Sequence, residues 1–268
     1  MSFRSGARRT GLATAVAVTV GLLAGPQAQA LTGGTPAGPG QDLEEVAFLH
    51  PDGSLACEGS IISATAVLTS AACVDGEHGL TLAFRYGSHD DHEGGHIALI
   101  GTRVIHPDYD PATHDADIAV VHPLLPMVLD ANAQPVQLAT AGSDPGPGAT
   151  LIVSGWGDAT TQQPARAFPL PVIPDEQAKQ LFSTEITLSQ CQSAVGSDVN
   201  PTDMLCAQSP GGSACGGDSG GPLTLDGPNG RSVLVGATSF GIQGCPKGAP
   251  SVFTRVSTFN QWIKDMAY

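Results

Sequence analysis

One serine lies in a glycine-rich segment that could support nucleophilic chemistry. Ser219 stands within CGGDSGGP, residues 215–222, with glycines on both sides. Glycine permits tight turns and lets a ligand come close to the backbone. The N–H groups of such a turn can converge on a developing oxyanion while the serine supplies a hydroxyl nucleophile. A Gly-Asp-Ser-Gly string alone could be a surface turn, but the full eight-residue context favours a nucleophile.

Residues 89–96 (HDDHEGGH) are dense in side chains that bind metals. Imidazoles and carboxylates together could hold a divalent cation. The glycine pair and the position of the segment favour an exposed hairpin loop instead. No Cys-x-x-Cys pair occurs, which disfavours a zinc site built from the cysteines. We therefore expect no metal and no cofactor.

The sequence pattern predicts that the elements which position Ser219 are β-strands. Short β-branched and apolar runs, separated by Gly, Pro, Asp and Ser, occur at residues 61–62, 66–69, 97–105, 118–121, 150–154 and 232–236. This rhythm is typical of an antiparallel sandwich or barrel. The pattern of residues 257–268 instead predicts a helix, with Ser257 or Thr258 as its N-cap residue. Its core-facing stripe would be Phe259, Trp262, Ile263 and Met266.

Composition and charge exclude several classes of protein. The chain has 268 residues, and its 34 glycines and 21 prolines disfavour a helix bundle. Its net charge is −14, and three of the 11 basic residues precede residue 10. The remainder sets 8 basic residues against 25 acidic ones. Such a surface disfavours nucleic acid and anionic lipid as partners.

Residues 1–30 have the pattern of a secretory signal peptide. Arg4, Arg8 and Arg9 precede an uncharged stretch over residues 11–24, and residues 28–30 form an Ala-x-Ala cleavage site. The apolar stretch is short for a membrane span, although an uncleaved anchor is the alternative. Arg8-Arg9 also raises twin-arginine export. We expect a secreted protein with no membrane association after cleavage.

All six cysteines follow residue 30, at Cys57, Cys73, Cys191, Cys206, Cys215 and Cys245. An even number of cysteines in an oxidising compartment indicates three disulfides. Their spacing alone does not choose among the pairings.

Ordered motifs across residues 31–268 resemble the chymotrypsin-like (trypsin-like) serine peptidase family. Besides the Ser219 segment they are LTGG from Leu31, CEGS from Cys57, VLTSAAC ending at Cys73, HPDY from His106, DIAV from Asp117, SGWG from Ser154, MLCA from Met204, SFG from Ser239 and VFTRV from Val252. Residues 168–188 match this pattern poorly and read as a variant surface loop.

The resemblance implies an all-β fold. It consists of two antiparallel β-barrels with a crossover near residues 123–135, a short C-terminal helix, and the active cleft between the barrels. The implied disulfides are Cys57–Cys73, Cys191–Cys206 and Cys215–Cys245.

The resemblance also implies roles for the site residues. Ser219 would be the nucleophile, Asp117 the catalytic aspartate, and the N–H groups of Gly217 and Ser219 the oxyanion hole. Cleavage after Ala30 would expose Leu31, whose ammonium would pair with Asp218.

A specificity pocket follows from the same resemblance. It would have Ser213 at its base, Gly241 leaving one wall open and Ser251 narrowing it. A serine at the base implies an apolar or aromatic substrate side chain.

The position expected to hold the general-base histidine is Ala72, directly before Cys73. Residues 67–69 and Cys73 fix the register, so no shift supplies a histidine. Alanine cannot take the proton from Ser219 or return it to the leaving group, so we expect strongly impaired proteolysis. His114, three residues before Asp117, reads as a loop residue rather than a substitute base.

Two functions therefore stay open. The first is a weak secreted endopeptidase, in which a substrate histidine could enter the space beside Ala72. The second is a pseudopeptidase that binds a protein or peptide. A third interpretation is that Ala72 is an introduced change in an active enzyme. A monomer acting on a protein or peptide is expected in each case.

Overall fold

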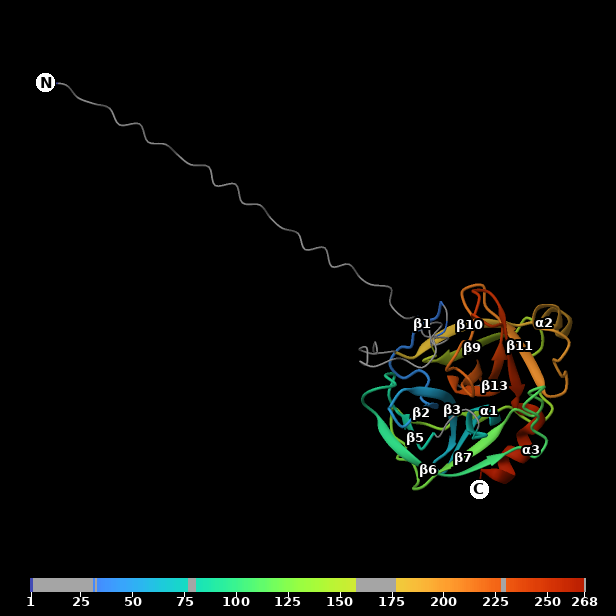
Figure 1. Ribbon diagram of the computed structural model, residues 1–268, viewed down its shortest axis with the longest axis horizontal. Helices are drawn as coiled ribbons and strands as arrows, with labels where there is room; N and C mark the ends of the chain where they lie inside the picture. The colour runs from blue at the N-terminus through green and yellow to red at the C-terminus, as the bar shows by residue number, and fades with distance from the viewer. Residues whose placement is uncertain (2–30, 32, 77–80, 158–176, 228–229, 268) are drawn as a thin grey trace.

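The computed structural model of the chain describes residues 1, 31, 33–76, 81–157, 177–227 and 230–267. Strands dominate it, and they form two stacked groups, with β2–β7 below and β9–β11 and β13 above (Figure 1). The predicted signal peptide, residues 1–30, falls almost entirely outside the described residues.

The first barrel is a closed antiparallel ring in the order β2-β3-β4-β7-β6-β5. Its strands are β2 (Glu45–Leu49), β3 (Leu55–Ser63), β4 (Ala66–Thr69), β5 (Ala83–Tyr86), β6 (His96–Ile105) and β7 (Ala119–Pro123). Alternate residues of a strand point to opposite faces, so each strand supplies a row of side chains to the interior. Phe48, Phe84 and Val121 are fully buried there.

The second barrel closes because β10 pairs with both β11 and β9. Its strands are β9 (Thr150–Gly155), β10 (Lys179–Glu185), β11 (Met204–Gln208), β12 (Pro222–Asp226), β13 (Ser232–Gly241) and β14 (Pro250–Arg255). Two short strands extend this sheet, β1 (Thr35–Pro36) beside β10 and β8 (Gln137–Leu138) beside β13. The predicted all-β fold of two antiparallel barrels is confirmed.

The two barrels share a hydrophobic core at their junction. Leu151, Leu234 and Phe253 of the second barrel belong to one buried cluster with Leu68 and Ile118 of the first. Burial of apolar surface is the main favourable contribution to folding, so this junction fixes how the barrels face each other. Asp117 and Thr69 border the same junction.

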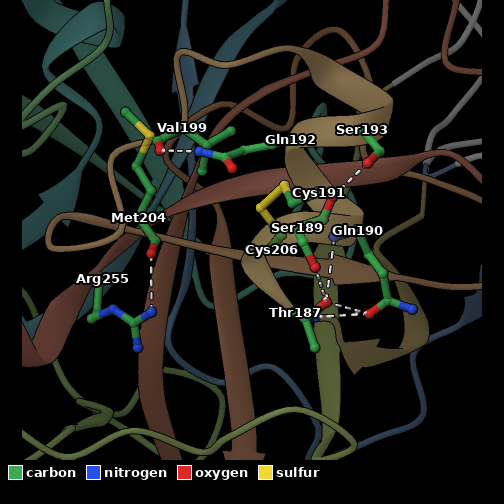
Figure 2. Close-up of a disulfide and its surroundings, with 10 residues drawn as sticks. All are labelled: Thr187, Ser189, Gln190, Cys191, Gln192, Ser193, Val199, Met204, Cys206 and Arg255. Atoms are coloured by element: carbon green, nitrogen blue, oxygen red, sulfur yellow. Dashed lines mark hydrogen bonds between the residues drawn. A yellow bond between two sulfur atoms is a disulfide. The ribbon is translucent and has the colours of Figure 1, made fainter.

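The described residues also include three short helices: α1 (Ala71–Val74), α2 (Leu188–Val195) and α3 (Val256–Met266). The Ser70 side chain caps α1 by accepting a hydrogen bond from Cys73 N. Thr187 and Gln190 form a reciprocal capping box on α2 (Figure 2). No helix in the described part of the chain is long and apolar enough to span a bilayer.

The three disulfides pair as the resemblance implied: Cys57–Cys73, Cys191–Cys206 and Cys215–Cys245. Cys191–Cys206 joins α2 to β11, as Figure 2 shows. Cys57–Cys73 joins β3 to α1, and Cys215–Cys245 ties the Ser219 loop to the loop after β13. Two of the three bonds therefore hold segments that border the cleft.

Two sequence predictions were wrong in detail. The C-terminal helix begins at Val256 with Arg255 as its N-cap residue, because Thr258 lies inside the first turn and donates to Thr202 O at 2.6 Å. Residues 158–176 lie outside the described part, but 179–185, read as part of a surface loop, form strand β10. Its six-residue pairing with β9 overrides its polar sequence.

The apolar stripe of α3 is confirmed, since Phe259 and Ile263 are buried in the junction cluster and Trp262 and Met266 pack against it. We predict that Ile263→Ala lowers the free energy of unfolding by about 2–5 kcal/mol, because it leaves a cavity. Denaturant titration with the disulfides intact measures this. Lys264→Ala, on the exposed side of the same helix, should cost less than about 1 kcal/mol. Equal losses in the two variants would contradict the assigned packing.

Candidate active site

Asp117 is fully buried at the junction and accepts hydrogen bonds from both barrels. Its Oδ1 accepts from Ala72 N at 2.8 Å, and its Oδ2 accepts from the Ser239 hydroxyl at 2.5 Å. Its main-chain carbonyl accepts from the Thr254 hydroxyl at 2.8 Å. A buried carboxylate needs such donors because it has lost its water. These bonds bring α1, β13 and β14 to one point.

Ala72 lies in α1, half-buried, with its N–H directed at Asp117. The Ala72 side chain is a methyl group, which has no lone pair to accept a proton. Helix α1 therefore supplies no general base to the site. Among the residues that the structure describes, the Ser219 hydroxyl makes no hydrogen bond. A serine hydroxyl without a base is a weak nucleophile.

The Ser219 loop is packed against the start of α1. Glu58 N donates to Ser219 O at 2.8 Å, and a Cβ atom on Gly220 would overlap Thr69 Oγ1 and Glu58 O. Gly220 has φ +83°, which favours glycine. Only glycine fits at position 220, where the backbone lies against Thr69 and Glu58. This close contact places Ser219 beside α1, the helix that contains Ala72.

The N–H groups of Gly217 and Ser219 are available for an oxyanion. Neither donates a hydrogen bond to another residue of the described chain. Gly217 has φ +99°, and a side chain there would press against Gly157 and Leu55. Unpaired N–H groups of this kind are the donors that stabilise a tetrahedral intermediate.

A cavity of about 170 Å³ opens beside Ser219. Its lining carries no charged side chain and consists of Ala214, Cys215, Gly216, Ser219, Thr238, Ser239, Phe240, Gly241, Ile242, Gln243 and Cys245. Of the three pocket residues predicted, Gly241 lines the cavity, whereas Ser213 and Ser251 lie buried outside its lining. The Ser251 hydroxyl accepts from Ala214 N at 3.1 Å and would lie 3.8 Å from a Cβ on Gly241. The cavity is therefore narrow and uncharged.

His114 lies closer to the site than its sequence position suggested. Its Nδ1 is 3.8 Å from Asp117 Oδ2, and its ring stacks on Phe240 with centroids 5.1 Å apart. Asp117 raises the pKa of His114 above its usual 6.5, while partial burial of the ring lowers it. His114 is a loop residue, as expected, but its ring lies beside Asp117. The spacing of three residues from Asp117 was the available signal.

A second carboxylate pair lies behind the Ser219 loop. Asp218 accepts hydrogen bonds from Gly157 N at 2.8 Å and Cys215 N at 2.6 Å. The buried Glu58 accepts from Trp156 N at 2.5 Å through Oε1, while its Oε2 has no hydrogen-bond partner. Burial, followed by the charge of Asp218, raises the pKa of Glu58 well above 4.5. Burial and the neighbouring Asp218 therefore favour the protonated form of Glu58.

Glycines make room for this pair. A Cβ on Gly155 would lie 2.5 Å from Glu58 Oε2 and 2.6 Å from Asp218 Oδ1. Leu31 is fully buried nearby, and its N donates to Gly157 O at 2.8 Å. Sequence reasoning missed Glu58, although an acidic residue inside the buried strand β3 was a visible signal.

The histidine-rich segment 89–96 connects β5 and β6, the hairpin loop that its glycines predicted. Its groups are used in structural contacts. Arg85 donates to the carbonyls of Asp91, His92 and Gly94, and His96 Nε2 lies 3.1 Å from Asp130 Oδ2. In the described part of the chain, no three His, Cys, Asp or Glu side chains are grouped to hold a metal ion.

Comparison with known proteins agrees with this geometry. A sequence model of the Trypsin family matches residues 31–263. The chain is 34% identical to human Serine protease 56 over 88% of its own length, and it spans 38% of that protein. It is 35% identical to Trypsin Blo t 3 of Blomia tropicalis, covering 78% of this chain and 76% of that one.

A solved structure is also similar. Neuropsin, a serine protease expressed in the limbic system of mouse brain, superposes with a TM-score of 0.72 at 28% identity. The match covers 87% of this chain and 98% of neuropsin.

The Glu58–Asp218 pair leads to a prediction about stability and pH. Since the folded-state pKa of Glu58 is raised, its contribution to stability is complete below its ordinary pKa of 4.5 and is lost as pH rises through the folded-state value. Glu58→Gln removes this loss. In the full-length chain, whose Leu31 nitrogen is an amide, the substitution should raise Tm by about 2–4 °C at about pH 8. At about pH 4 the gain should vanish.

Calorimetry at the two pH values checks this prediction. Glu93→Gln, an exposed carboxylate on the 89–96 loop, is the matched control and should shift Tm by less than about 1 °C at either pH. A Glu58→Gln variant that is less stable than the parent at the higher pH would refute the assigned protonation.

Proposed function

Since this chain belongs to the trypsin family of serine peptidases, we propose that it is a serine endopeptidase whose turnover through Ser219 is strongly impaired. The observation that supports this best is the geometry around Asp117. Its carboxylate accepts hydrogen bonds from Ala72 N and from Ser239, which lines the same cavity as Ser219, while the Ala72 side chain supplies no base. Its substrate is a protein or a peptide. Its reaction is peptide-bond hydrolysis through an acyl-enzyme.

Each part of the site has a role in this reaction. Ser219 Oγ attacks the scissile carbonyl, and the N–H groups of Gly217 and Ser219 receive the oxyanion. A triad base would take the hydroxyl proton and return it to the leaving amine. Loss of the triad histidine in subtilisin, an unrelated serine peptidase, costs on the order of 10⁶ in turnover, while roughly 10³–10⁴ over water remains. We expect a loss and a residual rate of similar size for this chain, because Ala72 stands in place of the triad histidine.

The N-terminus would complete the site after cleavage. We propose that removal of residues 1–30 leaves the peptidase domain 31–268 with a free ammonium on Leu31. The position of Leu31 N beside Gly157, whose own N–H donates to Asp218, supports an ion pair between the Leu31 ammonium and Asp218. Three disulfides are consistent with folding in an oxidising compartment, which supports secretion.

A second function is favoured by Ala72 itself. A cleft with its oxyanion donors and cavity but no general base can bind a peptide without cleaving it, because binding and turnover depend on different interactions. In that case the chain is a secreted pseudopeptidase. Peptide binding by the parent without Ser219-dependent cleavage would identify it.

Restoring the base should restore activity. We predict that Ala72→His raises kcat/KM for chromogenic peptides at least about 10³-fold, because the imidazole would enter a site that already holds Asp117 and Ser219. Ala72→Asn, which is polar but cannot accept the proton, should match the parent. Adding Ser219→Ala to Ala72→His should abolish the gain. An Ala72→His variant that folds but cleaves no faster than the parent would refute the proposed function.

The uncharged cavity predicts the preferred side chain. In the Ala72→His background, peptides with Phe or Leu before the scissile bond should be cleaved at least about tenfold faster than those with Arg. The reason is that burial of a guanidinium without a carboxylate partner is costly. A preference for Arg in the same kcat/KM series would overturn the assignment of this cavity.

A further inference from the structure

The backbone holds His114 in an unusual conformation. Its φ is +60°, a region that costs energy for residues with a side chain. His114 N donates to Asp110 O at 2.8 Å, and Asp110 pairs with Asp115 in an isolated antiparallel bridge. This tight loop runs between β6 and β7. The result is a ring that is directed at Asp117 rather than at solvent.

Two contacts fix the ring itself. One face stacks on Phe240 at an interplanar angle of 29°, and Nδ1 faces Asp117 Oδ2 at 3.8 Å. The imidazole Nδ1 is buried and has no hydrogen-bond partner within the described residues, whereas 35% of the side chain is exposed. The carboxylate therefore favours the proton on Nδ1. That tautomer leaves the lone pair on Nε2, as a catalytic imidazole requires.

The ring also adjoins the cavity that contains Ser219. Phe240 and Ser239 line that cavity together with Ser219. The His114 ring stacks on Phe240. The Ser239 hydroxyl donates to Asp117 Oδ2, the oxygen that His114 Nδ1 faces. Ala72 is small and donates to the other oxygen of Asp117. Phe240 and Ser239 therefore connect the His114 ring to the cavity that holds Ser219.

We propose that His114 is the general base for the residual reaction of Ser219, acting through one water molecule beside Ala72. This inference rests on the proposed function and identifies which group supports its remaining turnover. General bases reach their proton directly or through one water, and this mechanism requires one water molecule that bridges Ser219 Oγ and His114 Nε2.

The step balances as an acyl transfer. As Ser219 Oγ forms its bond to the substrate carbonyl carbon, its proton passes to the water, and a proton of that water passes to His114 Nε2. The imidazolium is stabilised by Asp117. The proton then returns by the same route to the leaving group as the bond to carbon breaks. A hydrolytic water repeats the sequence and frees Ser219.

The mechanism predicts a dependence on pH. The charged groups acting on His114 are Asp117 and Asp110, and both raise its pKa, while burial lowers it to a smaller extent than the neighbouring Asp117 carboxylate raises it. A base must be neutral to act, so the rate should rise with pH through an apparent pKa above 6.5.

The test is hydrolysis of the p-nitrophenyl ester of N-acetyl-phenylalanine, whose good leaving group makes slow catalysis measurable. The rate of the parent minus that of Ser219→Ala is the Ser219-dependent rate. We expect His114→Ala to lower it at least about tenfold and to remove the inflection above pH 6.5. His122→Ala is the matched control, since its ring bonds Thr65 O further along β7, and should change the rate less than about twofold.

A double-mutant cycle separates catalysis from folding. In the Ala72→His background another base is present, so the cost of His114→Ala should shrink to less than about threefold. An equal cost in both backgrounds would make His114 structural and overturn the inference.

Two further outcomes overturn it differently. If the parent exceeds Ser219→Ala but His114→Ala matches the parent, another base acts and the proposed function stands. If the parent equals Ser219→Ala, no residual reaction exists, and the inference fails while Ala72→His still decides the proposed function.

Discussion

The buried carboxylate of Asp117 is the interaction on which the site depends. A fully buried Asp must find hydrogen-bond donors, and it takes them from Ala72 N on α1 and from Ser239 on β13. Thr254 on β14 holds its carbonyl. One side chain thus joins the two barrels where Ser219 and the cavity lie. The arrangement is satisfied without a histidine, which explains how the fold keeps its geometry when Ala72 occupies that position.

A second buried carboxylate pair supports the Ser219 loop from behind. Asp218 accepts from Gly157 and Cys215, so one side chain ties the start of the Ser219 loop to the segment that follows β9. Glu58 adds a protonated neighbour whose space depends on Gly155. Because two carboxyl groups share this space, the loop is sensitive to pH and to any cation placed there. Leu31, fully buried and bonded to Gly157, is the segment that could bring an ammonium to it.

Much of the fold could be predicted from local patterns. Alternating strands, the stripe of α3 and the glycines around Ser219 are determined by short-range geometry, whereas the disulfide pairing was implied only by the family resemblance. Residues with non-local partners escaped prediction. Glu58 meets Asp218 across 160 positions of chain, and β10 is a strand because β9 pairs with it. His114 approaches Asp117 only because its backbone adopts a positive φ, which its sequence does not announce.

We infer that the site is complete apart from the base, and a crystal structure of the Ala72→His variant is the sharpest test of this. We expect an imidazole between Asp117 and Ser219, with one nitrogen bonded to Asp117 and the other about 2.6–3.2 Å from Ser219 Oγ. Gly217, Ser219 and Asp117 should keep their positions. An imidazole turned out to solvent, or a rebuilt Ser219 loop, would contradict the claim.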